Sequence, residues 1–205
     1  MTELSALFVK AFFAFLAIMN PLANIPVFLG VTSDATAPER RAIALRSILV
    51  AFLLVATFTV AGQLLLRSFG VEIPSIRVFG GLIVMRVGFD LITQNAATSH
   101  SASGGTHEGL GRAISPLGIP ILAGPGTLAT AMGLSPTGDL TMHLVVIAAF
   151  AAVAVLTLVA FLASGRILEW LGEELIAATT KVMGMILGAI GTQMLVQGLR
   201  TMIGT

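Results

Sequence analysis

Cysteine and tyrosine are absent from this 205-residue chain, and tryptophan occurs only once. Without cysteine, the chain has no disulfide framework, thiolate chemistry or cysteine-ligated metal site. Charged residues are also scarce: they make up 10% of the sequence, against about 25% in soluble globular domains. The formal net charge of +1 gives no sign of a nucleic-acid partner. This composition argues against a soluble protein.

Long uncharged hydrophobic runs fill the chain instead, and hydrophobic residues make up 56% of it. A helix needs roughly 20 apolar residues to cross a bilayer, so we predict a multi-pass membrane protein with the lipid bilayer as its surroundings. The first charge is Glu3 and no basic segment precedes the first run. We therefore interpret that run as a retained span and not as a signal peptide.

The predicted fold is all-α with six transmembrane helices. Helices 1 and 4 are discontinuous, because proline-rich segments interrupt them at residues 20–26 and 115–126. The six spans are predicted at residues 4–31, 41–66, 75–93, 111–134, 140–164 and 175–201.

A loop at residues 96–110, rich in Ala, Thr, Ser and Gly, divides this single membrane domain into repeats at 1–95 and 111–205. Because each repeat has three spans, the second must enter the membrane from the opposite side, which makes the repeats inverted. Three short matches, at offsets of 95, 102 and 104 residues, support the repeat. They pair Asn20-Pro21-Leu22 with Ser115-Pro116-Leu117, Phe69-Gly70 with Leu171-Gly172, and Arg77-Val78-Phe79-Gly80 with Lys181-Val182-Met183-Gly184.

The distribution of basic residues between the loops predicts the orientation of the chain in the membrane. The loops after spans 1, 3 and 5, with their flanks, carry six Lys or Arg residues, and the other side carries Lys10, Arg67, Arg77 and Arg200. Because cytoplasmic loops are enriched in Lys and Arg, we predict that both termini lie on the non-cytoplasmic side.

Five of the eight prolines lie in the two interrupting segments. Proline removes a backbone donor and clashes with the preceding turn. Unpaired peptide groups cost several kcal/mol each in hydrocarbon, so such breaks occur only inside protein or beside a watery cavity. Asn20 is a good N-cap and Pro21 suits the first helical position. Ser115-Pro116 repeats that arrangement.

Each half-helix N-terminus offers free N–H donors and roughly half a positive charge, which together favour a bound carboxylate. The alternative is two packing kinks. The candidate substrate-binding residues are Asn20, Pro21, Asn24, Pro26, Ser115, Pro116, Pro120, Gly124, Pro125, Gly126 and Thr127.

Other residues have both functional and structural interpretations. Asp90 is the only acid within a predicted span, and it can either couple ion movement to transport or pair with Arg86 one turn earlier. Four polar residues within the spans can line a pore or bond between helices: Gln63, Thr192, Gln193 and Gln197. Four glycines are predicted to pack helices closely: Gly80, Gly81, Gly184 and Gly188. His100, His107 and Glu108 lie in the Ser/Gly-rich loop, so no metal site is expected.

The motifs resemble the MarC family of six-span inner-membrane proteins, which is grouped with the lysine-exporter superfamily. The resemblance covers nearly the whole chain. It is carried by residues 20–28 (NPLANIPVF), 79–81 (FGG) and 116–126 (PLGIPILAGPG). Asp90 matches an acidic position that the family often has near the end of span 3. Arg86 departs from the family pattern, in which an apolar residue is more usual.

The resemblance implies a carrier of glycine and other small neutral amino acids in the inner membrane, coupled to a proton or sodium gradient. Half-helix donors would hold the carboxylate, and Asn side chains with backbone carbonyls would hold the ammonium group. Multidrug efflux is an alternative, although a drug pocket usually needs more aromatic residues. A non-transporting scaffold is another alternative. No P-loop, Rossmann fingerprint or nucleophile elbow is present, so we expect neither an enzyme nor a bound cofactor. A homo-oligomer is left open.

Overall fold

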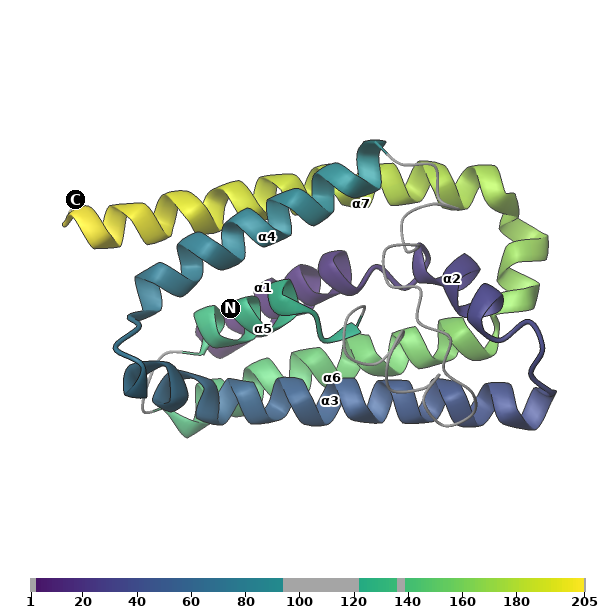
Figure 1. Cartoon of the computed structure of the whole chain (residues 1–205), viewed down its shortest axis with the longest axis horizontal. Helices are drawn as coiled ribbons and strands as arrows, with labels where there is room; N and C mark the ends of the chain where they lie inside the picture. Colours follow the sequence, from purple (N-terminus) through teal and green to yellow (C-terminus); the bar gives the residue numbers. More distant parts are fainter. Residues whose placement is uncertain (1–2, 94–121, 136–138, 205) are drawn as a thin grey trace.

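The computed structural model describes residues 3–93, 122–135 and 139–204, which contain seven α-helices (Figure 1). The predicted loop at 96–110, with His100, His107 and Glu108, lies outside the described residues. So do Ser115, Pro116 and Pro120. The helices are α1 (Glu3–Met19), α2 (Asn24–Val31), α3 (Ala37–Ser68), α4 (Ile73–Thr93), α5 (Pro125–Leu134), α6 (Leu140–Leu162) and α7 (Ser164–Ile203).

Three of the described helices are long and apolar enough to cross a membrane: Ala37–Gly62 of α3, all of α6, and Glu174–Ile203 of α7. The pair α1 and α2 makes a fourth candidate if it is counted as one bent span. Helix α4 has 21 residues but carries three charged side chains, Arg77, Arg86 and Asp90. The described part of the chain is therefore a bundle of membrane helices, one of which is interrupted.

The interrupted span is held against α6 on both sides of its break. Phe15 of α1 meets Phe150 of α6 edge to face, with ring centroids 5.1 Å apart. Phe28 of α2 stacks on Phe161 of α6 at 4.4 Å. All four rings are fully buried, and such pairs stabilise by about 0.5–1.5 kcal/mol beyond the area they bury. Helix α6 thus fixes the position of both half-helices.

The outer end of α2 is joined to the start of α3 by polar contacts. The backbone N–H and the hydroxyl of Thr36 both donate to Glu39 Oε2, at 2.8 and 2.7 Å, in the manner of a capping box. Arg40 Nη2 donates to the carbonyl of Thr32 at 3.2 Å, where the last carbonyls of α2 lack helical partners. These contacts fix the turn that follows the interrupted span.

Helix α7 bends at Gly172, where φ is 71° and ψ is 163°. This region of backbone space is essentially open only to glycine. The bend separates the membrane-length part of α7 from a short helical segment, 164–171, that the sequence analysis did not predict. Trp170 on this segment is 86% exposed.

Helices α4 and α7 pack closely and run antiparallel, as Figure 1 shows. A Cβ added to Gly81 would lie 2.6 Å from the carbonyl oxygen of Gly191, and one added to Gly88 would lie 2.6 Å from that of Gly184. Such distances leave no room for a side chain, so the two backbones touch directly at these points.

The remaining predicted packing glycines differ from that pattern. A Cβ added to Gly80 would overlap the Cβ of Ala129, so Gly80 faces α5, and from α7 only the side-chain end of Met194 comes near, at 3.6 Å. Gly188 departs from the prediction, because a Cβ added there would meet nothing within 4 Å. The side-chain position of Gly188 points into open space, although its backbone N–H lies against Gly88.

Candidate substrate site at the helix breaks

The first break separates α1 from α2, whose axes are bent by 50°. Its pivot is Asn20, which adopts a left-handed backbone with φ of 37°. Asn tolerates this conformation better than most residues, because its short polar side chain can bond locally. Helix α2 begins at Asn24 and not at Pro21 as predicted, since a left-handed Asn20 sends the chain through a turn over residues 21–23.

Two asparagine side chains bridge this break, and both residues are only 4% exposed. Asn24 Nδ2 donates to the carbonyl of Met19 at 2.5 Å, which satisfies an end carbonyl of α1. Asn20 Oδ1 accepts from the N–H of Ala23 at 3.4 Å, so it serves the turn in the way that an N-cap serves a helix. These contacts explain how the break is stabilised in an apolar interior.

One donor at the break has no partner among the described residues. Asn20 Nδ2 is buried and makes no hydrogen bond. An unsatisfied buried polar group costs about 1–3 kcal/mol, and buried polar atoms are otherwise paired in the large majority of cases. This N–H₂ group is therefore a free donor at the pivot of the interrupted span.

The second break is described from Leu122 onward. Gly124 is extended, with φ of −67° and ψ of 171°, and Pro125 occupies the first turn of α5. The first-turn N–H groups of Gly126 and Thr127 have no acceptor within their helix. The hydroxyl of Thr127, which is 1% exposed, donates to the carbonyl of Leu122 at 3.3 Å. The first-turn N–H groups at this helix start thus lie in a buried setting.

The two breaks belong to one core. Leu122 and Ala123 lie in the same buried cluster as Phe15 and Met19, and α1 contacts α5. In Figure 1, α2 and α5 start in the middle of the molecule and run outward in opposite directions. Both half-helix N-termini, which carry partial positive charge, therefore face the interior. Pro26 lies in the first turn of α2 and is partly buried.

A pocket of about 280 Å³ lies beside α5, between α1, α4 and α7. Its polar lining includes Lys10, Arg77, Gln193 and Gln197. The two glutamines stand one helical turn apart, and pore lining was one of their two predicted roles. Lys10 had entered the sequence analysis only as a charge that sets the orientation, and Arg77 as such a charge and in one of the repeat matches. Their convergence depends on tertiary packing, and no local motif indicated it.

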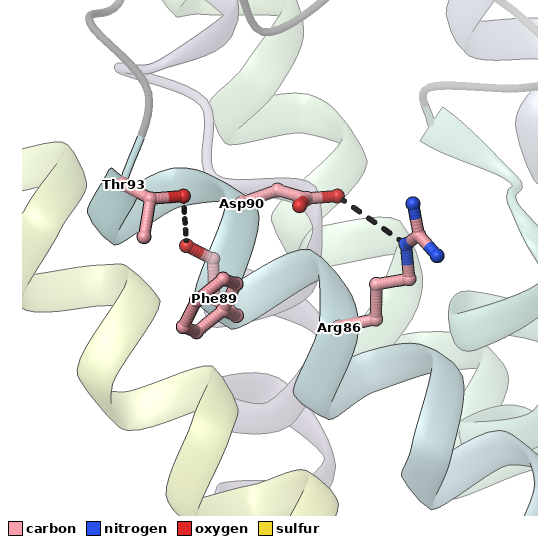
Figure 2. Close-up of polar contacts among 4 residues, drawn as sticks. All are labelled: Arg86, Phe89, Asp90 and Thr93. Atoms are coloured by element: carbon pink, nitrogen blue, oxygen red, sulfur yellow. Dashed lines mark hydrogen bonds and ion pairs between the residues drawn. The ribbon is translucent and has the colours of Figure 1, made fainter.

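Asp90 and Arg86 form an ion pair along α4, with Arg86 Nε and Asp90 Oδ2 3.8 Å apart (Figure 2). Their side chains are 40% and 83% exposed, respectively. Neither residue belongs to the pocket lining. This geometry is the ion pair one turn apart that the structural interpretation predicts.

We expect Asp90→Asn to leave the pH dependence of uptake within about twofold of the parent, because Asp90 pairs with Arg86 on its own helix and lies outside the pocket lining. Initial uptake rates between pH 5.5 and 8.5 measure this. Loss of pH dependence in Asp90→Asn, with Arg86→Gln unaffected, would instead assign proton coupling to Asp90.

These features define an integral membrane protein with an interrupted first span and a buried polar break. The chain belongs to the MarC family: residues 5–203 match the model of the MarC family integral membrane proteins. It is 35% identical to the membrane protein YvbG of Bacillus subtilis, over 95% of this chain and 94% of that protein. It is 36% identical to the inner membrane protein YhgN of Escherichia coli K12, over 89% and 91% of the two chains. The inner membrane protein MarC of Citrobacter koseri is 31% identical, over 93% and 92%. No solved structure matches the chain at a significant level.

Proposed function

We propose that this protein is a secondary transporter of small neutral amino acids such as glycine and alanine. In this proposal six spans form two inverted repeats, which rock around the broken helices and use a proton or sodium gradient. The observation that carries the proposal is the buried break, where a free amide donor lies beside half-helix termini. The protein would sit in the cell inner membrane with both termini on the non-cytoplasmic side.

A constant spacing between equivalent elements supports the repeat. Helix α3 covers residues 37–68, and 103 residues later α6 and the short segment before the bend of α7 cover 140–171. Helices α2 and α5 end at residues 31 and 134, again 103 apart. Gly70 and Gly172, which are 102 residues apart, both have positive φ. This spacing brings Asn20-Pro21 close to Gly124-Pro125, and not to Ser115-Pro116 as the short sequence matches suggested.

The contacts between helices support the same relation. Moving Gly81 and Gly88 along the chain by 103 residues gives Gly184 and Gly191. Applying the repeat to the contact of Gly81 with Gly191 therefore gives a contact of Gly184 with Gly88, which is also observed. The contacts between whole helices correspond in the same way. Helix α4 contacts α5 as α7 contacts α2, and α3 contacts α5 as α6 contacts α2. An exchange of this kind is expected of inverted repeats related by a pseudo-two-fold axis.

The charges at the break suit a zwitterion. The C-terminal end of α1 carries partial negative charge and the N-terminal ends of α2 and α5 carry partial positive charge. An amino acid would place its ammonium group towards the carbonyls that end α1. Its carboxylate would accept from Asn20 Nδ2 and from the first-turn N–H groups of Gly126 and Thr127.

Uptake by proteoliposomes tests the function. We expect purified protein to accumulate labelled glycine or alanine above empty liposomes, and more strongly when an inward proton or sodium gradient is imposed. Collapsing the gradient with an ionophore is the control for coupling. If no small amino acid enters while a cationic dye is carried out, multidrug efflux replaces this proposal. If nothing moves, the scaffold alternative replaces it.

A further inference from the structure

The pocket between α1, α4, α5 and α7 is separate from the breaks, and its charges are of one sign. We propose that it is an entry vestibule in which Arg77 and Lys10 bind the carboxylate of an incoming solute before that solute reaches the breaks. This inference rests on the proposed transport function for the identity of the solute, but the anion site itself does not.

The pocket can hold an anion and has little with which to hold a cation. Among the described residues that line it, Lys10 and Arg77 are the only charged ones, and no carboxylate is present. Gln193 and Gln197 add amide donors on the α7 side. A concave site with low-dielectric walls and one sign of charge concentrates counter-ions, which raises association rates by 10-fold or more.

Arg77 is held in place by α5 and keeps donors to spare. Its Nη2 donates to the carbonyl of Gly133 at 3.1 Å. A Cβ added to Gly133 would lie 3.7 Å from Arg77 Cγ, so the arginine stem lies along the bare backbone of α5. A guanidinium has five N–H donors in a planar fork that fits a carboxylate. One bond to Gly133 therefore positions the group and leaves other donors for a ligand.

The pocket leads towards both breaks. Its lining residue Ala14 stands six residues before Asn20, and Thr130 stands five residues after Pro125. At 1.5 Å per residue these separations are about 9 and 7.5 Å along the two helices. Solute in the pocket is thus one to two helical turns away from the candidate substrate site.

An apolar cluster separates the two places. Ala17, Val84 and Leu187 are buried together, and Ile190 and Met194, which also line the pocket, pack against them. Met194 is unbranched and adaptable, and its sulfur lies 3.9 Å from the hydroxyl of Thr130. Displacement of Met194 and Ile190 would connect the vestibule with the breaks. The described arrangement is therefore that of a transporter whose site is closed off from this vestibule.

A single engineered cysteine tests the vestibule cleanly, because the chain has no native one. Gln193→Cys would be purified in detergent and reacted with methanethiosulfonates of similar size, one carrying an anionic sulfonate and one a cationic trimethylammonium group. Ser33→Cys, on the exposed turn after α2 at the opposite end of the molecule (Figure 1), is the matched control. We expect the ratio of anionic to cationic rate at Gln193→Cys to exceed that at Ser33→Cys about tenfold.

Removing either charge should lower that preference. Arg77→Gln and Lys10→Gln, each combined with Gln193→Cys, should reduce the rate ratio several-fold and leave the ratio at Ser33→Cys unchanged. Two independent substitutions keep the test valid if one of them misfolds. A ratio at Gln193→Cys equal to that of the control, or insensitive to both substitutions, would overturn the vestibule, whatever the uptake assay gives.

Protection of the engineered cysteine by added ligands identifies the anion that the pocket binds. In nanodiscs, millimolar glycine or alanine should slow the anionic reagent at Gln193→Cys but not at Ser33→Cys, whereas added phosphatidylglycerol should not slow it. Protection by the anionic lipid alone would make the pocket a headgroup site and overturn the vestibule. Amino-acid protection together with absent uptake would support the vestibule while the proposed transport function failed.

Discussion

Uptake of labelled glycine is expected to fall about 100-fold when Asn20 is replaced by aspartate. The substitution keeps an oxygen that accepts from the N–H of Ala23, so the turn retains its contact. It replaces the free Nδ2 donor with an acceptor that repels a carboxylate. A hydrogen bond to a charged group contributes about 1.5–3 kcal/mol, which alone corresponds to roughly 10- to 100-fold, and repulsion adds to it. Initial rates in proteoliposomes measure the effect.

Asn20→Gly is the matched control, because glycine adopts the left-handed backbone at no steric cost. It removes the donor, together with the oxygen that accepts from the N–H of Ala23, without adding a charge, so we expect a smaller loss, of about tenfold. Both variants should elute as the parent does on size exclusion. Parental uptake by the aspartate variant would remove Asn20 from the substrate site.

Alanine at Gly81 is expected to lower the free energy of unfolding by about 1–3 kcal/mol, the range measured for overpacked cores. Its methyl group would lie 2.6 Å from the carbonyl oxygen of Gly191 and 2.7 Å from the backbone nitrogen of Leu195. Neither atom is the end of a flexible side chain, so one helix backbone must move. Helix content followed during unfolding of the purified protein measures the change.

Alanine at Gly188 provides the contrast on the same pair of helices. Its methyl group meets nothing within 4 Å, and alanine favours a helix over glycine by about 1 kcal/mol. We expect Gly188→Ala to unfold at the same or a higher temperature than the parent. Equal destabilisation by both substitutions would mean that close approach of α4 and α7 does not distinguish these sites.

The proline pattern predicted the interruption of the first span, because proline acts on its own turn and leaves a local signal. It could not give the residue at which α2 starts. That residue depends on the left-handed backbone of Asn20, which the surrounding core selects. Gly172 shows the same limit: glycine permits the bend in α7, but many other glycines in this chain lie in regular helix.

The pairing of Asn24 with the carbonyl of Met19 was also beyond sequence reasoning, which had assigned both asparagines to the substrate. The structure gives one of them a structural bond and leaves a donor of the other free. In the same way, Lys10 and Arg77 lie far apart in the chain, so no sequence pattern indicates that they line one pocket. Spacing indicates partners within one helix, as it did for Arg86 and Asp90, but not between helices.

The contact between α4 and α7 has a mechanical consequence. Where glycines meet, main-chain atoms touch main-chain atoms, and the branched side chains of Val84, Leu91 and Leu187 pack together beside these points. A joint of that kind resists being pulled apart, since dispersion acts over its whole length. Any movement of α4 relative to α7 must therefore keep these two backbones in contact.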